Sequence, residues 1–414
     1  MSIQGAAKKP QETPGSGEAG GREKKDLYEI GEIPPLGHVP KNMYAWSIRE
    51  ERHGEPDKAM QIEVLPTWEL DSHDVLVFVM AAGVNYNGVW ASLGTPISPI
   101  KDVHKNPYHI AGSDASGIVW AVGSKVKRWK VGDEVVVHCN QDDGDDEECN
   151  GGDPMYSTSQ RIWGYETPDG SFAQFCRVQA RQLMPRPRHL TWEESACYTL
   201  TLATAYRMLF GHEPHVLKPG DNVLVWGASG GLGVFAVQLC AVSGANAMGV
   251  ISDDSKRDYV LSMGAKAVLN RKEFNCWGQL PTVNGPDFTT YMKEVRRFGK
   301  AIWGVTGGKD VDIVFEHPGE ATVPVSVFVV KRGGMVVICA GTSGFNLTVD
   351  ARILWMRQKR LQGSHFAHLY HAAQANQLVI DRRIDPAMSE VLPWEKIPDA
   401  HEKMLDNKHL PGNM

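Results

Sequence analysis

A glycine-rich turn after a short apolar strand carries the clearest chemistry in this chain. Residues 222–226 are mostly apolar, and a helical pattern runs from Phe235 to Cys240. Glycines spaced three apart in this context let the backbone turn tightly and approach a pyrophosphate, which the amides of the following helix stabilise. A helix start with incidental glycines is the alternative. We predict that a dinucleotide binds along Gly227, Ser229, Gly230, Gly231, Leu232 and Gly233.

The end of the next predicted strand, 247–251, bears on which dinucleotide binds. NAD sites place an acid there for the ribose 2′-hydroxyl, whereas NADP sites use small polar and basic groups for the 2′-phosphate. Ser252 stands at the strand end, with Lys256 and Arg257 one turn later. These residues predict NADPH. Asp253 is the objection, since an error of one residue in the register would make it the acid of an NAD site.

A second string lies upstream, in the part of the chain rich in short strands. Gly112–Gly117, followed by Val122–Gly123 and Gly132–Asp133, resembles the barrel signature of the medium-chain dehydrogenase/reductase superfamily. Zinc-binding members carry Cys where this chain has Asn85 and His where it has Ser113, and they add four cysteines for a structural zinc. The resemblance therefore implies that no metal is bound. Hydride transfer without a Lewis acid favours reduction of an activated C=C bond.

Three further strings narrow the resemblance, namely 83–90, 160–166 and 360–366. Together they are similar to the crotonyl-CoA carboxylase/reductase family. That family reduces a short α,β-unsaturated acyl-CoA with NADPH and captures CO2 with the resulting enolate. The resemblance implies the same substrates here, and it implies a homotetramer.

The family's CO2 pocket carries over onto Asn87, the backbone of Tyr165, Glu166 and His365. Many relatives have Phe at the position of Tyr165. Hydride attack at Cβ leaves negative charge on Cα and on the thioester oxygen, so water must be kept from the enolate. The amide of Asn87 and a main-chain N–H can hold CO2 oxygens as an oxyanion hole does. Glu166 and His365 can fix one ordered water.

Each of these residues also has a simpler interpretation. Asn85 and Asn87 can cap a turn, which is a common use of asparagine. Glu166 can be an exposed loop acid, and His365, with two histidines close by, can lie on the face of a helix. The joint occurrence of the three strings favours the functional interpretation.

Two more assignments concern the cofactor and the CoA. Thr204 resembles the superfamily's threonine near the nicotinamide, although it can also terminate a helix turn. Arg352 begins a basic cluster that ends at Arg360 and suits the phosphates of a long anionic ligand. A solvated helix face fits that cluster equally well. Arg352 is the predicted CoA contact.

The elements that position these residues divide into two kinds. From Met43 to about Cys176 the pattern is of short strands and turns, with strands expected at 75–79, 117–120, 133–137 and 170–175. From about Thr199 helices and strands alternate, as a doubly wound parallel sheet requires, with strands expected at 222–226, 247–251, 311–315 and 334–339. We predict an α/β fold with a GroES-like barrel domain (27–198 and 350–414) and a Rossmann domain (199–349).

Composition bounds the remaining possibilities. A net charge of -6 argues against a nucleic-acid surface, no apolar run approaches the ~20 residues of a membrane span, and seven scattered cysteines indicate reduced thiols in the cytoplasm. Residues 1–26 have almost nothing to bury and are expected to be disordered. The acidic run 142–148 lacks calcium-ligand spacing, so we expect a solvated insertion.

Reductive carboxylation of an enoyl-CoA is thus the leading hypothesis. A reductase of enoyl thioesters or quinones that protonates the enolate is the first alternative. A nucleotide-binding structural or sensor protein is the second, because a fold does not dictate an activity.

Overall fold

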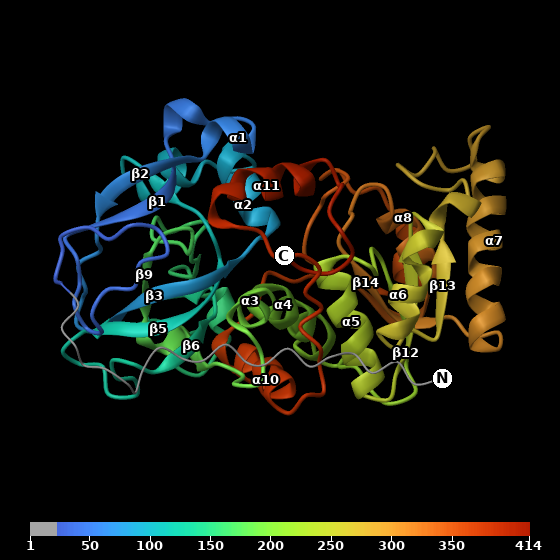
Figure 1. Ribbon diagram of the computed structural model, residues 1–414. Helices are drawn as coiled ribbons and strands as arrows, with labels where there is room; N and C mark the ends of the chain where they lie inside the picture. The colour runs from blue at the N-terminus through green and yellow to red at the C-terminus, as the bar shows by residue number, and fades with distance from the viewer. Residues whose placement is uncertain (1–22) are drawn as a thin grey trace, which may run out of the picture.

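A computed structural model describes residues 23–414 (Figure 1). Most of the tail predicted to be disordered, residues 1–22, lies outside the described residues. The prediction extended to residue 26, and this part is wrong. The amide of Asn42 donates to the carbonyl of Asp26 at 2.9 Å, and Lys41 pairs with the Asp26 carboxylate at 2.8 Å. The packed chain therefore begins before residue 27.

The N-terminal half is built from antiparallel strands. Its five-stranded sheet has the order β10-β6-β5-β3-β9, with β3 at Asp74–Gly83, β5 at Asp114–Val122, β6 at Glu134–Val137, β9 at Phe175–Gln179 and β10 at Leu183–Pro185. Smaller sheets join β1 (Asn42–Ile48), β2 (Gln61–Pro66) and β4 (His109–Ile110), and β7 (Asn140–Gln141) with β8 (Arg161–Ile162). The helices of this half are α1 (Pro56–Ala59), α2 (Tyr86–Leu93) and α3 (Trp192–Ala196).

Three of the four strands expected here lie within or beside β3, β5 and β6. The fourth, expected at 170–175, is wrong, because regular pairing begins only at Phe175. Gly170 packs so closely that a Cβ atom there would lie 2.5 Å from the carbonyl oxygens of Ile110 and Ala111. The segment before β9 is thus a closely packed loop.

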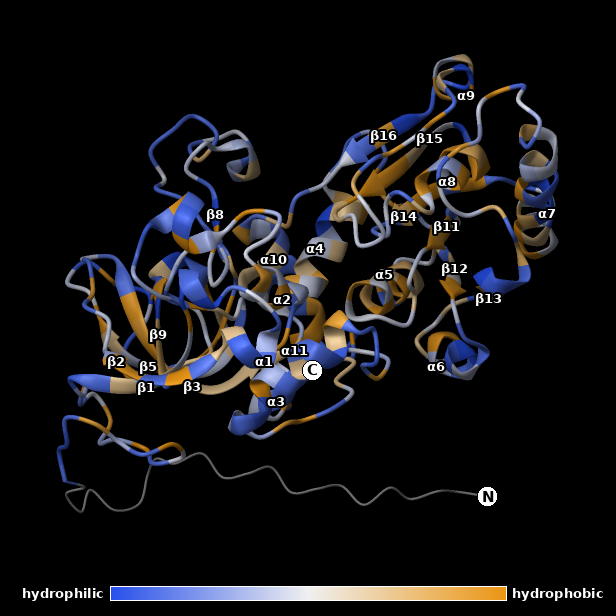
Figure 2. Cartoon of the chain, turned by 90° about the horizontal axis from the view of Figure 1, so that it is seen from above, coloured by the Kyte–Doolittle hydropathy of each residue, from blue (hydrophilic) through white to orange (hydrophobic). Residues whose placement is uncertain are grey.

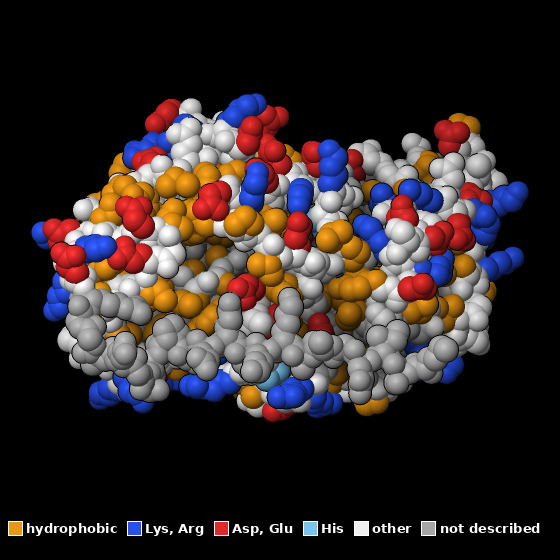
Figure 3. Space-filling view, viewed as in Figure 1, with side chains coloured by type: hydrophobic (Ala, Val, Ile, Leu, Met, Phe, Trp, Pro, Cys, Tyr) orange, Lys and Arg blue, Asp and Glu red, His pale blue; other side chains and the backbone are white. Residues whose placement is uncertain are grey.

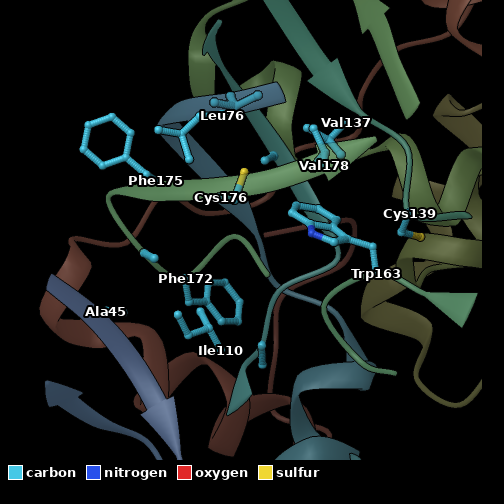
Figure 4. Packing of buried hydrophobic residues seen from close by; sticks show 14 of the residues in the cluster. Ala45, Leu76, Ile110, Val137, Cys139, Trp163, Phe172, Phe175, Cys176 and Val178 are labelled. Atoms are coloured by element: carbon cyan, nitrogen blue, oxygen red, sulfur yellow. The ribbon is translucent and has the colours of Figure 1, made fainter. Parts of the chain in front are cut away.

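The core of this half holds the segment that bears two predicted site residues. Trp163 is fully buried among Val137, Cys139 and Val178 (Figure 4). Its indole N–H donates to the carbonyls of Asp169 at 2.9 Å and Arg177 at 3.1 Å. A buried, hydrogen-bonded indole fixes the backbone on either side of it.

The C-terminal half contains a six-stranded parallel sheet. Its order is β13-β12-β11-β14-β15-β16, with bounds β11 Asn222–Val225, β12 Asn246–Ile251, β13 Ala267–Asn270, β14 Val311–Glu316, β15 Val330–Ile338 and β16 Arg360–Gly363. Numbered from β11, this is the order 3-2-1-4-5-6 of a Rossmann sheet. The central strands are hydrophobic along their length (Figure 2), as expected where helices cover both faces.

All four strands expected in this half are present, but the predicted end of the domain at residue 349 is too early. Strand β16 pairs in parallel with β15, from Met335 opposite Arg360 to Ile338 opposite Gly363. The sheet therefore continues to Gly363. Strand β16 is the edge strand of the sheet and therefore contains polar and basic residues. For this reason its sequence lacks the apolar pattern that predicts a strand.

Helices cover both faces of the sheet (Figure 1). One apolar layer involves α4 (Thr199–Phe210), α5 (Gly231–Val242), α6 (Arg257–Ser262) and α10 (Leu369–Ile380), and the other involves α7 (Phe288–Thr306), α8 (Val323–Val329) and α9 (Ala351–Met356). Helices α4 and α10 lie between the two halves of the molecule. Helix α11 (Ile397–Leu405) returns to the barrel half and packs on α2, where His401 closely approaches Gly88.

The surface carries charges of both signs. Basic and acidic side chains are interspersed over the described residues on the face shown in Figure 3. In the acidic run, Asp142 is buried against Arg181, whereas Asp143, Asp145 and Glu147 are exposed. None of the helices within residues 23–414 is long and apolar enough to cross a membrane. The seven cysteines, all in the described part, are unpaired.

Candidate active site

The glycine-rich turn has the geometry of a dinucleotide cradle. Gly227 adopts φ +55, and a Cβ atom at Gly233 would overlap the carbonyl oxygen of Gly227. Gly230 is the N-cap of α5, a helix of 12 residues. The first amides of any α-helix have no partner within the helix, so those of Gly231, Leu232 and Gly233 can meet a pyrophosphate. Ser229 precedes them in the turn.

The end of β12 determines which residue stands at the position that distinguishes NAD sites from NADP sites. Strand β12 ends at Ile251, so Ser252 is the first residue after it. Asp253 is the N-cap of the next turn, and its carboxylate accepts from the amide of Ser255 at 2.9 Å. Arg257 is engaged by Asp254 at 2.6 Å, while the ammonium of Lys256 has no ion-pair partner within the described chain. Ser252 and Lys256 are therefore available to a ligand at this strand end.

The turn before α2 places two asparagines against the barrel signature. Asn85 is the N-cap residue of α2, but its side chain makes no capping bond. Instead its amide donates to the Asp114 carboxylate at 3.0 Å. The Asn87 amide donates to the hydroxyl of Ser113 at 3.4 Å. Neither asparagine therefore acts as a turn cap through its side chain.

The carboxylate of Asp114 anchors this turn. It is fully buried and also accepts from the hydroxyl of Thr199 and, at 2.8 Å, from the amide of Leu200. Burial raises the pKa of the Asp114 carboxyl to about 7, although the donors around it favour the ionised form. The anchored turn keeps Asn87 at the surface of the barrel core.

A tight turn brings Tyr165 and Glu166 to the same place. A Cβ atom at Gly164, which has φ +75, would overlap the carbonyl of Gly112, so this turn lies directly on the barrel signature. The amide of Glu166 donates to the Ile162 carbonyl at 2.7 Å, and its carboxylate accepts from the Ile162 amide at 2.7 Å. Glu166 is half-buried and is not an exposed loop acid.

Tyr165 is oriented by its ring and its hydroxyl. The hydroxyl donates to the carbonyl of Ile97 at 3.2 Å, and the ring lies 6.5 Å from that of Trp90. The amide of Tyr165, which the resemblance assigns to CO2, donates to the Ile162 carbonyl at 3.2 Å. The amide of Tyr165 is thus already engaged in a hydrogen bond within the turn.

His365 lies in the loop between β16 and α10, and the interpretation as a helix-face histidine is wrong. It lines a cavity of about 410 Å³ with Met155, Tyr156, Arg207, Ile338, Cys339, Ala340, Gly363 and Ser364. Burial lowers the pKa of His365, the charge of Arg207 lowers it further, and the charge of Glu166 raises it. Glu166 therefore lies within electrostatic range of His365.

The cavity lies where a Rossmann sheet binds its ligands. Ile338 and Gly363 are the last residues of β15 and β16, and ligands of such sheets bind at the carboxyl ends of the strands. The volume is in the range of small-ligand pockets. The opposite wall comes from the loop after the acidic run and from α4.

Sequence reasoning missed the ion pair that builds that wall. Arg207, only 2% exposed, holds the Asp153 carboxylate at 2.6 and 3.2 Å. Asp153 caps the turn that presents Met155 and Tyr156 to the cavity. No local signal reveals this pair, because its partners are 54 residues apart.

The two remaining predicted residues lie elsewhere. Thr204 is buried in the middle of α4, where its hydroxyl donates to the Leu200 carbonyl at 2.7 Å, so it does not terminate a helix turn. Arg352 is half-exposed on α9 and pairs with Asp350 at 2.8 Å. Lys359 of the basic cluster instead donates to the carbonyls of Val327 and Phe328. The cluster is therefore not one surface.

No group of three or more His, Cys, Asp or Glu side chains suited to a metal occurs among residues 23–414. Asn85 and Ser113, at the positions of zinc ligands in the superfamily, are held by Asp114 and Asn87.

Comparisons with known proteins agree with this architecture. Residues 71–188 match the alcohol dehydrogenase GroES-like domain, and residues 231–381 match the zinc-binding dehydrogenase model. A crotonyl-CoA carboxylase/reductase of Cereibacter sphaeroides is 75% identical over 94% of this chain and 91% of its own length. A solved crotonyl-CoA carboxylase/reductase has a TM-score of 0.93 at 76% identity, covering 95% of this chain and 92% of that one.

A more distant solved structure shows ligands in its own site. The 2-octenoyl-CoA carboxylase reductase CinF, in complex with NADP and 2-octenoyl-CoA, has a TM-score of 0.84 at 37% identity, covering 91% of this chain and 87% of that one. The similarity thus extends over nearly the whole length of this chain. This chain belongs to the crotonyl-CoA carboxylase/reductase family of the medium-chain dehydrogenase/reductase superfamily.

Proposed function

We propose that this protein converts a short enoyl-CoA, NADPH and CO2 into a 2-alkylmalonyl-CoA, with crotonyl-CoA giving ethylmalonyl-CoA. The observation that carries the proposal is the convergence of Asn87, Ser113 and the Gly164–Glu166 turn, with His365 within electrostatic range of Glu166. The names of the similar proteins, which include a carboxylase/reductase and a complex with NADP and an enoyl-CoA, support it.

The cradle and the strand end are the parts of the chain that fit NADPH. Gly227 and Gly233 allow a tight turn that a Cβ atom at either position would obstruct, and the start of α5 offers free amides. Ser252 and Lys256 would receive the 2′-phosphate, and Thr204 would lie near the nicotinamide. When bound, NADPH supplies the hydride that reduces Cβ of the thioester.

The residues of the barrel side would then decide what the enolate meets. Asn87 has one amide hydrogen directed at Ser113, which leaves the other free for an oxygen of CO2. Donors held in place before the reaction stabilise a developing carboxylate at little reorganisation cost. The amide of Tyr165 would contribute a second donor if the turn relaxes its bond to Ile162.

Glu166 and His365 would deny the enolate a proton. A water bridging the carboxylate and the imidazole is held by both groups and is less free to act as an acid. Because the pKa of His365 is lowered, its imidazole is neutral at physiological pH and does not itself supply an acidic proton. Carboxylation is thereby favoured over protonation.

Five further parts of this proposal concern the whole protein. Arg352 would contact the CoA, the barrel part including the residues after β16 would bind the thioester, and the sheet region would bind NADPH. We also propose a homotetramer, as the family resemblance implies, and a location in the cytoplasm, which agrees with seven unpaired thiols.

One experiment tests the proposal directly. The purified protein is mixed with NADPH and crotonyl-CoA or acrylyl-CoA, with and without isotope-labelled bicarbonate and carbonic anhydrase, and the thioesters are analysed by mass spectrometry. We expect labelled ethylmalonyl-CoA from crotonyl-CoA. Butyryl-CoA without label would show a non-carboxylating reductase, and no oxidation of NADPH with either thioester would refute an enzymatic role on these substrates.

A further inference from the structure

A three-residue segment, Gly412–Met414, lies between the dinucleotide cradle and the turn that bears Asn87. Figure 1 shows this end of the chain at the junction of the two halves, near α2 and α5. All three residues are buried. The segment contacts both the dinucleotide cradle and the turn that bears Asn87. The proposed reaction requires a fixed position of one relative to the other.

On the cradle side, the contact is made by Gly412. Its amide donates to the carbonyl of Ser229 at 2.9 Å, and it forms a parallel bridge with Gly230. Gly412 adopts φ +106, and a Cβ atom there would overlap the Ala387 carbonyl. Only glycine fits this close approach without strain.

Asn413 is held by hydrogen bonds of both its side chain and its backbone. Its side-chain oxygen accepts from the hydroxyl of Thr201 on α4 at 3.1 Å, and the same oxygen packs directly on Gly231, the first residue of α5. Its backbone amide donates to Ala387 at 2.8 Å, and its carbonyl accepts from the amide and the hydroxyl of Ser389, both at 2.8 Å. Asn413 therefore has no freedom to shift without disturbing α4 or α5.

On the barrel side, the contact is made by Met414. Its main-chain oxygen accepts from the amide of Val84 at 2.9 Å. Val84 directly precedes Asn85, the N-cap of α2, and α2 carries Asn87 in its first turn. The backbone of Gly412–Met414 thus connects Ser229 to the turn of Asn87, with one main-chain hydrogen bond at each end of the segment.

We propose that Asn413 is a positioning residue that fixes the dinucleotide cradle relative to the Asn87 turn. The inference rests on the proposed function, because the register matters only if hydride transfer and CO2 capture occur at neighbouring carbons. Small displacements of groups that position reacting atoms reduce rates strongly. Loosening Asn413 should therefore affect the cradle and the fate of the enolate together, although Asn413 lies outside the group of residues assigned to CO2.

The test uses side-chain changes at both ends of one hydrogen bond. In Asn413→Ala the acceptor for Thr201 is lost, and in Thr201→Val the donor is lost at nearly constant volume. Thr201→Ser keeps the hydroxyl. Asn275→Ala, at an exposed asparagine in the segment between β13 and α7, is the matched control. NADPH affinity is measured by fluorescence without thioester, and the carboxylated-to-reduced product ratio is measured at saturating NADPH.

We expect Asn413→Ala to weaken NADPH binding and to lower the product ratio, each by about fivefold, the lower end of the range for coupled sites. Thr201→Val should move both quantities in the same direction, and the double variant should be no worse than Asn413→Ala, since the two residues share one interaction. Thr201→Ser and Asn275→Ala should match the parent.

Two results would overturn the inference. One is an unchanged NADPH affinity and product ratio in both Asn413→Ala and Thr201→Val. The other is additive losses in the double variant, which would make the two residues independent structural contacts. Failure of the proposed function is recognised separately, because the parent protein would then give no labelled product, while its affinity for NADPH would still report on Asn413.

Discussion

The side-chain amide of Asn87 donates to the hydroxyl of Ser113, with 3.4 Å between Nδ2 and Oγ. In zinc-binding members of the superfamily the position of Ser113 belongs to a histidine ligand. Here the same position orients an amide, and Asn85, at the position of a cysteine ligand, is held by Asp114 at 3.0 Å. Each of the two asparagines thus donates to a different residue of the barrel signature, Asn85 to Asp114 and Asn87 to Ser113.

Asn87→Leu tests the proposed CO2 contact. The change keeps a similar volume and removes both donor and acceptor, so carboxylation should lose up to about 3 kcal/mol of transition-state stabilisation, roughly a hundredfold. We expect the product to shift from ethylmalonyl-CoA to butyryl-CoA while NADPH oxidation persists. Isotope-labelled bicarbonate with mass spectrometry measures the ratio.

Ser113→Ala is the control for this experiment. It removes the acceptor of the Asn87 amide but leaves the amide in place, so a smaller shift in the same direction is expected. Label incorporated by Asn87→Leu at the parent's ratio and bicarbonate affinity would exclude Asn87 from CO2 capture.

The pH dependence of the product ratio tests the state of His365. Burial and the charge of Arg207 lower the pKa of the imidazole below its ordinary value, so His365 is neutral at pH 7 and protonates only in more acidic solution. At constant dissolved CO2, the fraction of carboxylated product should stay level from pH 8 to about 6.5, the ordinary histidine pKa, and should fall only below it.

The ratio is measured under a fixed CO2 atmosphere, so that the bicarbonate equilibrium does not enter. His365→Asn should remove the acid-side change and give a low, level ratio. A transition centred at or above the ordinary histidine pKa in the parent protein would contradict a neutral imidazole at the site.

Charge reversal at Lys256 tests the cofactor assignment. Arg257 is engaged by Asp254 and by the Val268 carbonyl, whereas Lys256 has no ion-pair partner within residues 23–414. We expect Lys256→Glu to reduce the preference for NADPH over NADH by at least about tenfold, or 1.4 kcal/mol. The ratio of kcat/KM for the two cofactors is the measurement. Lys266→Glu makes the same charge change at an exposed site elsewhere in this half and should leave the preference intact.

Alanine substitutions at two glycines of the cradle distinguish an effect on packing from an effect on ligand binding. A Cβ atom at Gly233 would overlap the Gly227 carbonyl, whereas one at Gly230 would meet its nearest atom at 3.5 Å, an ordinary contact. Gly233→Ala should therefore lower the thermal midpoint and weaken NADPH binding together. Gly230→Ala should keep the midpoint and weaken binding alone, because a methyl group stands where the pyrophosphate approaches. Equal affinity for NADPH in both variants and the parent would place the cofactor elsewhere.

Elements with a strong local signal could be predicted from the sequence. The strand before Gly227 and the helix after it follow from an apolar run, glycine spacing and a helical pattern, and all are found. The end of β12 at Ile251 follows from the same kind of signal. Edge strand β16 could not be predicted, because an edge strand needs few apolar side chains and its pairing with β15 is long-range.

The contacts within the candidate site could not be predicted from the sequence. The structure brings Asn87 to the Gly112–Ser113 backbone that underlies Gly164, and no spacing along the chain announces that meeting. Arg207 and Asp153 were missed for the same reason, since each looks like an ordinary surface charge until burial pairs them. The amide of Tyr165 shows a further limit, as its bond to Ile162 depends on a turn that only coordinates reveal.

The hydroxyl of Tyr165 ties two segments of the barrel half together. Through its 3.2 Å bond to the Ile97 carbonyl, it tethers the stretch that follows α2 to the turn that carries Glu166. A phenylalanine would keep the aromatic wall beside Trp90 and release the tether. The aromatic contact and the tether are therefore separable properties of this side chain, because one oxygen atom makes the second without changing the first.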